Sequence, residues 1–278
     1  MILFGSLQDL TTFQFNIVDN VFSLTVATMG AAALFFFNAR SLVAPKFRPA
    51  MMVSGLVVAI ACYHYFMIRS SWQSAYAYGS GSFTASGKGF NDFYRYADWI
   101  LTVPLLMVEL IAVMGLRKEV ARPLLTKLVI AAALMIGLGY PGEVSQDWGT
   151  LVLWGALSTI PFLYILYVLW VELSKSLAAQ PPHVRSLLSI CRIVIVVTWM
   201  FYPIAYGIRG DSLPGAIPGI VPEKSGLGVV GTQVGYAIAD IVAKAGFGLL
   251  IFFIARAKTD ALTDAERAEQ NKAAMALV

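Results

Sequence analysis

The stretch GVVGTQVGYAIADIVAKAGFGLLIFFIAR, residues 228–256, is apolar over almost its whole length, yet it carries Asp240 and Lys244 near its middle. A helix needs about 20 predominantly apolar residues to cross a bilayer. Six further runs of this kind occur at residues 14–38, 50–70, 93–115, 123–140, 148–174 and 186–208. A spanning strand needs only about 10 residues. We therefore predict an all-α protein, a bundle of seven transmembrane helices.

The composition agrees with a polytopic membrane protein. Of 278 residues, 58% are apolar and 13% are charged, and the mean hydropathy is +0.73. A soluble globular protein carries about 25% charged residues, so this class is excluded. Two cysteines cannot form a disulfide framework, and two histidines cannot build a His-rich metal site. We expect neither a metal nor a nucleic-acid partner.

Basic residues near the span ends predict the orientation. One set of loops holds most of them: Arg40, Lys46, Arg48, Arg117, Lys118, Arg122, Lys127, Lys175, Arg185, Arg192, Arg256 and Lys258. The other set holds chiefly Arg69, Lys88, Arg209 and Lys224. Because basic loops stay on the cytoplasmic side, we place the N-terminus outside and the C-terminus in the cytoplasm, in a multi-pass protein of the cell (inner or plasma) membrane.

The loops leave no room for a second domain. Residues 71–89 are rich in Gly and Ser and predict an outer hairpin, and residues 210–228 form a Pro/Gly-rich loop. Residues 259–278 form a polar cytoplasmic tail. We predict a single seven-helix membrane domain over residues 1–278.

Ionisable residues inside spans are costly and point to function. Asp240 and Lys244 are four residues apart, on one face of a helix. The pair can be a structural ion pair that joins helices. Alternatively, Lys244 can lose its proton in a dry pocket and form a Schiff base with an aldehyde, which would require a counter-ion.

The run at 93–115 supplies such a counter-ion. Arg95, Asp98 and Thr102 follow one another at spacings of three and four, so they share one stripe. Glu109 lies three turns beyond Asp98, about 16 Å along the axis, on nearly the same stripe. Two carboxyl groups at different depths predict a proton relay through part of the bilayer.

These residues resemble those of a known family. RYADWILTVPLL (95–106), followed by Glu109, resembles the third helix of the microbial (type 1) rhodopsins, and DIVAK (240–244) resembles their retinal-binding seventh helix. WMFYP (199–203) is similar to the retinal wall of their sixth helix, and the likeness extends over residues 154–170 and the Tyr-His-Tyr at 63–65. The triplet of Asp98, Thr102 and Glu109 resembles that of the proteorhodopsin and xanthorhodopsin group of outward proton pumps.

The resemblance implies a light-driven outward proton pump, a transporter and photoreceptor pigment rather than an enzyme. Lys244 would hold all-trans retinal as a protonated Schiff base, with Asp98 and Asp240 as counter-ions. Asp98 would be the proton acceptor, and Glu109 would reprotonate the Schiff base from the cytoplasmic side. We expect a homo-oligomer, which is common in this family.

Three further residues receive roles from the resemblance. Thr102 would hydrogen-bond to Asp98, and Arg95 would order the outer half of the proton path. His64, in the second span, would pair with Asp98 and tune it. A lone membrane histidine is also a common helix–helix hydrogen bonder, and that reading stays open.

The resemblance also implies a retinal pocket lined by aromatic and small residues. Its expected members are Trp99, Leu106, Met107, Ser158, Thr159, Trp199, Tyr202, Pro203, Tyr206 and Tyr236. Leu106 stands where proteorhodopsins differ in colour and resembles the green-absorbing type. Gly155 is either a small residue for close helix packing or, as in xanthorhodopsin-like pumps, the window against which a carotenoid antenna rests.

Two other function classes remain. A sensory rhodopsin would use the same retinal site to signal to a partner protein, although Glu109 favours a pump. A seven-helix receptor or a retinal-free transporter would use the two charged groups as structural ion pairs.

Overall fold

The computed structural model describes residue 7, residues 9–145, 147–177, 180–207 and 226–263, and residues 266 and 269. It does not describe the side chains of Trp148, Glu172, Leu173, Ser176, Tyr206 and Leu227. Within this part of the chain, seven helical segments are long and apolar enough to cross a membrane: Thr12–Leu42, Pro45–Ala75, Phe93–Met114, Lys118–Glu143, Gly149–Val171, Pro182–Ala205 and Gly228–Asp260. The prediction of an all-α, seven-helix bundle is confirmed.

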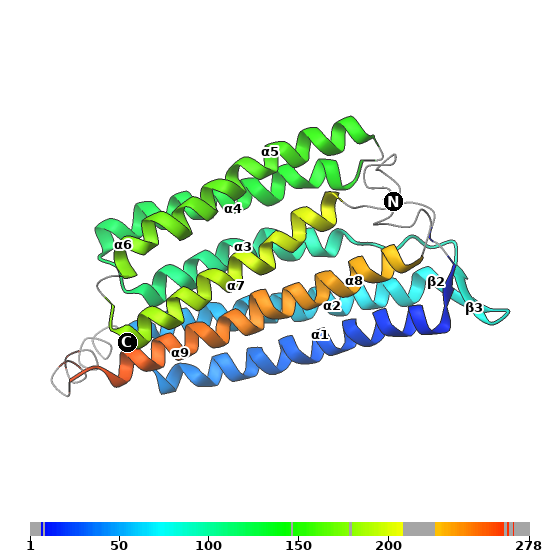
Figure 1. Ribbon diagram of the computed structural model, residues 1–278. Coiled ribbons are helices and arrows are strands. Elements are labelled where there is room, and N and C mark those ends of the chain that lie inside the picture. Colours follow the sequence, from blue (N-terminus) through cyan, green and yellow to red (C-terminus); the bar gives the residue numbers. More distant parts are fainter. Residues whose placement is uncertain are drawn as a thin grey trace.

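The helices lie nearly parallel along one long axis (Figure 1). They are α1 (Thr12–Ala39), α2 (Arg48–Ala75), α3 (Phe93–Met114), α4 (Lys118–Glu143), α5 (Trp148–Tyr167), α6 (Leu173–Leu177), α7 (Pro182–Gly207), α8 (Gly226–Asp240) and α9 (Phe247–Asp260). Consecutive helices from α1 to α5 pack against each other, and α8 and α9 close the bundle against α1 and α7. The most enclosed spans are α3 and the one formed by α8 and α9. These two spans carry the intramembrane charges.

The second and the last membrane-spanning helices extend beyond their predicted C-terminal ends. The second span continues through Ala75, five residues beyond the predicted end, and a strand begins at the next residue, Tyr76. The last span continues through Asp260, so the predicted tail begins as helix. Of the predicted loop at 210–228, residues 210–225 lie outside the described residues, and so does most of the tail.

Two spans contain a π-helical segment, Val168–Glu172 after α5 and Ile241–Gly246 between α8 and α9. A π-turn adds one residue to a helical turn and is frequent at functional sites. The second segment contains Lys244. The local widening thus coincides with the intramembrane lysine, and the apolar pattern of the sequence does not predict this widening.

A small sheet covers one end of the bundle, opposite the end formed by α6 (Figure 1). The predicted hairpin is confirmed as β2 (Tyr76–Gly79) and β3 (Ser82–Ala85), and β1 (Leu10–Thr11) pairs with the other side of β3. Ser80 and Gly81 both have positive φ, 53° and 86°, as a tight two-residue hairpin turn requires. Burial raises the pKa of Tyr76 at the start of β2 to about 12, and the nearby Asp9 adds to the effect.

Candidate functional site

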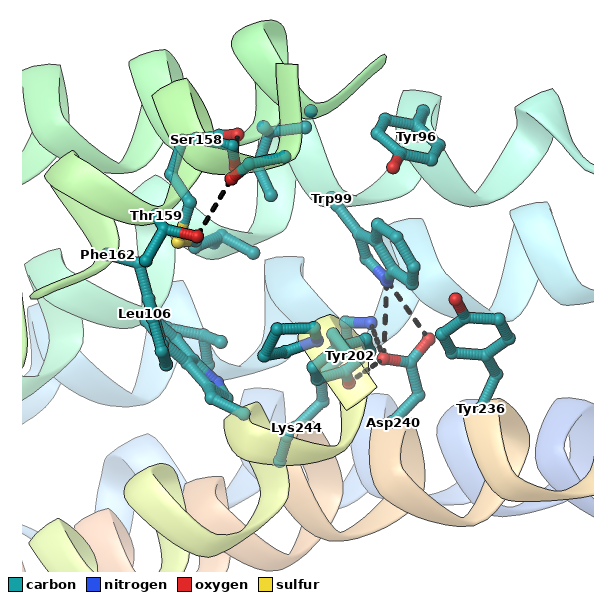
Figure 2. Close-up of a pocket in the computed structure, with 18 residues that line it drawn as sticks. Tyr96, Trp99, Leu106, Ser158, Thr159, Phe162, Tyr202, Tyr236, Asp240 and Lys244 are labelled. Carbon is teal, nitrogen blue, oxygen red and sulfur yellow. Dashed lines mark hydrogen bonds and ion pairs between the residues drawn. The ribbon is translucent and has the colours of Figure 1, made fainter. Parts of the chain in front are cut away.

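A cavity of about 190 Å³ lies inside the bundle between α3, α4, α5, α7 and the span of α8 and α9 (Figure 2). The residues that line it are Tyr96, Trp99, Val103, Leu106, Met135, Ile136, Gly139, Gly155, Ser158, Thr159, Phe162, Trp199, Tyr202, Pro203, Tyr236, Asp240, Ala243 and Lys244. In Figure 2, Lys244 and Asp240 lie beside Trp99 and Tyr202, whereas Ser158 and Thr159 lie across the cavity. The cavity therefore has its charged groups at one end and the hydroxyl side chains of Ser158 and Thr159 at the other.

Lys244 lies between two carboxylates at the charged end. Its Nζ is 2.7 Å from Asp98 Oδ2 and 2.8 Å from Asp240 Oδ1. The three side chains are no more than 2% exposed. A buried cation of this kind is tolerated because it is paired. Asp240 and Lys244, four residues apart, thus form an ion pair within one span. Asp98 on α3 supplies the second carboxylate.

Asp240 is held by three neutral hydrogen-bond donors. Its Oδ1 accepts from Tyr202 Oη at 2.5 Å and from Trp99 Nε1 at 3.3 Å. Its Oδ2 accepts from Tyr65 Oη at 2.8 Å. Hydrogen bonds of this kind stabilise a buried carboxylate in its charged form. Sequence reasoning gave Tyr65 no role of its own, although its neighbour His64 was singled out.

Asp98 has a different environment. The closest approach of His64 is 3.8 Å, from Nδ1 to Asp98 Oδ1, while the same Nδ1 lies 3.0 Å from the carbonyl oxygen of Ile60. Among the described residues, neither carboxylate oxygen of Asp98 receives a hydrogen bond of good geometry. The charged partner of Asp98 is therefore Lys244, and His64 is its next neighbour.

Thr102 hydrogen-bonds to Asp98 as expected, and the bond goes to the main chain of Asp98. Its Oγ1 donates to the main-chain carbonyl of Asp98 at 2.9 Å, not to the carboxylate. A threonine inside a helix can donate to the carbonyl four residues earlier. Thr102 therefore adjoins Asp98 without binding its charge.

Arg95 points away from the two counter-ion carboxylates. Its guanidinium donates to Asp92 and, at 2.6 Å, to Gln233 Oε1, and it lies 4.9 Å from the centre of the Tyr236 ring. The residue is only 1% exposed. The spacing of α3 predicts a shared stripe with Asp98, but the side chain is directed toward the end of the bundle that carries the sheet. Asp92 and Gln233 were not singled out from the sequence.

Glu109 is fully buried, in the half of the bundle opposite the sheet. Ser54 on α2 donates a hydrogen bond to Glu109 Oε2 at 2.5 Å and also contacts the Ala50 carbonyl. Among the described residues, Glu109 Oε1 has no hydrogen-bond partner. The two α3 carboxyl groups therefore have different neighbours: Asp98 adjoins a cation, and Glu109 adjoins a hydroxyl.

Most of the residues expected in the pocket line the cavity. Trp99, Leu106, Gly155, Ser158, Thr159, Trp199, Tyr202, Pro203 and Tyr236 are among them. Met107 is fully buried but is not among the lining residues. The side chain of Tyr206 lies outside the described residues. The hydroxyls of Ser158 and Thr159 donate to the carbonyls of Met135 and Gly155, so neither hydroxyl proton is directed into the cavity.

Tyr96 and Phe162 also line the cavity, although neither was expected there from the sequence. Tyr96 directly follows Arg95 in the span that carries the charged residues. An aromatic residue at that position is the feature from which its place in the cavity could have been predicted. Phe162 follows Pro161 in a continuous apolar run, where nothing distinguishes it from an ordinary core residue.

Comparisons with known proteins identify the family of the chain. A family model for bacteriorhodopsin-like proteins matches residues 16–258. A green-light absorbing proteorhodopsin from Gamma-proteobacterium EBAC31A08 is 31% identical over 237 residues, 84% of each chain. Bacteriorhodopsin from Halobacterium salinarum is 31% identical over 232 residues, 82% of this chain and 80% of the relative.

Solved structures give the same family. Xanthorhodopsin, described as a light-driven ion pump with a dual chromophore, is 52% identical with a TM-score of 0.85, over 91% of this chain and 98% of that one. A thermophilic rhodopsin is 48% identical with the same TM-score, over 92% and 100%. The chain therefore belongs to the bacteriorhodopsin-like family of membrane proteins.

Proposed function

We propose that this protein is a light-driven outward proton pump that carries retinal on Lys244. The observation that carries the proposal is the position of the Lys244 amine, which opens into an aromatic-lined cavity while two buried carboxylates flank it. The relation to proteorhodopsins and to xanthorhodopsin supports the same function.

The residues present fit this cofactor. The cavity runs from the amine to a wall formed by α4 and α5, and its lining is mainly aromatic and aliphatic. Retinal, an apolar polyene aldehyde that condenses with a lysine amine, supplies light absorption and a photoisomerisation. Trp99 and Trp199, which are buried, and Tyr202 line the cavity with aromatic rings that suit an apolar polyene.

Asp98 is the proton acceptor. Both carboxylates lie within 3 Å of the Lys244 nitrogen, but only Asp240 accepts hydrogen bonds from tyrosine and tryptophan side chains. A proton that leaves the nitrogen therefore goes to Asp98 in preference to Asp240. His64, at 3.8 Å, is placed to stabilise the charged acceptor before transfer.

Glu109 is the proton donor on the other side. It lies three helical turns from Asp98, and the predicted orientation places it toward the cytoplasm. Burial in an apolar region with a hydroxyl as its nearest polar neighbour favours a protonated carboxyl group, which can give up its proton to the Lys244 nitrogen. Arg95 lies on the opposite, outer side of the ion pair and orders the exit path through Asp92 and Gln233.

Gly155 is the basis for proposing a second chromophore, a carotenoid. It lines the cavity at the α5 wall, and the related xanthorhodopsin has a dual chromophore. We propose that the missing side chain permits a carotenoid to rest there. Mixing the pigment with hydroxylated carotenoids should give energy transfer to retinal, which Gly155→Trp abolishes and Gly137→Ala, a control on α4, leaves intact. No transfer in the parent protein would end this idea.

The identity of the transported ion is tested with the protein in liposomes. Replacing all sodium chloride by potassium sulfate should leave the light-driven pH change unaltered, because a carboxylate acceptor requires neither sodium nor chloride. Loss of the signal in the sodium-free or chloride-free medium would contradict proton pumping.

A further inference from the structure

A groove that opens on the surface of the bundle lies between α4 and α5. It is at the end of the bundle where α3 ends and α4 begins. These two helices pack side by side (Figure 1). The groove has a volume of about 370 Å³ and is lined by Leu116, Val120, Pro123, Leu124, Lys127, Tyr164, Tyr167 and Val168. It shares no residue with the cavity at Lys244. It is therefore a separate site.

The chemistry of this groove is amphipathic. Five of its lining residues are aliphatic or proline, two are tyrosines, and the remaining one is Lys127. Tyr164 and Tyr167 are 37% and 53% exposed. No acidic residue lines it, and within the described part of the chain Lys127 makes no ion pair. The groove thus combines an apolar floor with hydroxyl donors and an uncompensated positive charge.

The position of Lys127 makes that charge costly without a partner. It lies nine residues after Lys118, the start of α4, which is about 13 Å along the axis and inside the membrane-spanning segment. Side chains on a helix lean toward its N-terminus, so the Lys127 amine reaches back toward the membrane surface. An anion at the headgroup level is the partner that a lysine at this depth can meet.

The surrounding charges favour an anion as well. The segment that leads into the groove contains Arg117, Lys118 and Arg122 against one acid, Glu119. The predicted orientation places this segment on the cytoplasmic side, where anionic lipids are enriched. Basic pockets between transmembrane helices on this side bind lipid headgroups.

We propose that this groove binds one anionic phospholipid. The phosphate accepts hydrogen bonds from the Lys127 ammonium and from the hydroxyls of Tyr164 and Tyr167. One acyl chain covers Val120 and Leu124. A lipid fits better than free phosphate, because the apolar floor gives an inorganic ion nothing to bind, and better than a carotenoid, because a neutral polyene leaves the lysine unpaired.

The test uses the complete, retinal-loaded pigment in detergent with equimolar phosphatidylglycerol and phosphatidylcholine of identical chains. Native mass spectrometry should find phosphatidylglycerol retained in preference. Lys127→Gln should reduce this preference about fivefold, the effect of one basic contact near the surface. Lys127→Arg should keep it, and Lys88→Gln, which removes an exposed charge from the opposite end, should leave it unchanged. The visible band of each variant reports that it is folded.

Four results would overturn the proposal. Equal retention of the two lipids by the parent protein would show that no anionic site exists. An equal preference in Lys127→Gln and Lys88→Gln would show that the groove is not the site. Displacement of the lipid by millimolar inorganic phosphate, or a change of oligomeric state in Lys127→Gln without a change in lipid binding, would assign the groove to a free anion or to a second copy of the chain.

Discussion

Ser54 on α2 donates a hydrogen bond of 2.5 Å to Glu109 on α3, in a region where both residues are buried. Glu109 makes no ion pair with any described residue, whereas Asp98, three turns away on the same helix, lies against the Lys244 amine. The same helix therefore presents one carboxyl group suited to give a proton and one suited to receive it.

Replacing Glu109 by Gln should slow the recovery of the resting pigment about 100-fold or more at neutral pH, the usual effect of losing a positioned acid. The proton must then come from bulk water, so the recovery rate should fall about tenfold for each unit of rising pH. Flash photolysis over a pH series measures both effects. A recovery rate that stays independent of pH in this variant would exclude Glu109 as the donor.

Ser54→Ala should slow the same recovery step by a smaller factor, because it removes the hydroxyl that orients the Glu109 carboxyl group while leaving the acid in place. The hydrogen bond contributes about 1 kcal/mol, or about fivefold in rate. Ser41→Ala, on an exposed turn at the end of α1, is the matched control. Equal kinetics in the two serine variants would argue against this coupling.

Asp98→Asn should abolish pumping and move the visible band to longer wavelength. The carboxylate stabilises a positive charge near the Lys244 nitrogen in the ground state more than in the excited state, where that charge has moved away. Absorption spectra and light-induced pH changes measure the two effects. Glu119→Gln, an exposed change at the start of α4, should alter neither. Unchanged pumping in Asp98→Asn would overturn the assignment of the acceptor.

Tyr65→Phe and Tyr202→Phe each remove a donor from Asp240 while keeping an aromatic ring in place. With less support for its charge, Asp240 should compete with Asp98 for the transferred proton. Infrared difference spectra should then show two protonated carboxyl bands where the parent protein shows one. A single unchanged band in both variants would indicate that the tyrosines do not decide which carboxylate accepts.

Lys244→Ala should yield a colourless protein that does not bind retinal covalently. It also leaves two buried carboxylates without their cation, which should destabilise the apoprotein by about 3–5 kcal/mol. Adding Asp98→Asn to this variant should restore part of the lost stability, since one of the two charges is then removed. The thermal unfolding midpoints of the single and double variants measure this. A double variant less stable than the single one would contradict the ion-pair assignment.

The sequence predicts much of this site because its signals are local. Apolar runs of membrane length give the seven helices, and the four-residue spacing of Asp240 and Lys244 places them on one face. Hydrogen bonds between residues on different helices could not be predicted from spacing along one helix. Tyr65 and Ser54 are ordinary polar residues in the sequence, and they become partners of Asp240 and Glu109 only through the register of α2 against its neighbours.

Spacing along a helix also does not decide which atom a side chain contacts when two geometries compete. Arg95 shares a helix face with Asp98, but its long side chain extends to Asp92 and Gln233, and the latter comes from a distant part of the chain. Thr102 could reach either the carboxylate or the carbonyl of Asp98, and the helix geometry brings the carbonyl closer. The π-helical turn around Lys244 has no signature in the apolar pattern.

The central claim is outward proton transport driven by light, and the most direct test is the pH of a suspension of cells that express the chain with added retinal. Illumination should acidify the medium, and a protonophore should abolish the change. A coloured pigment that leaves the pH unchanged would contradict pumping and favour a sensor. Alkalinisation that the protonophore enhances would instead indicate transport of another ion and would contradict the roles assigned to Asp98 and Glu109.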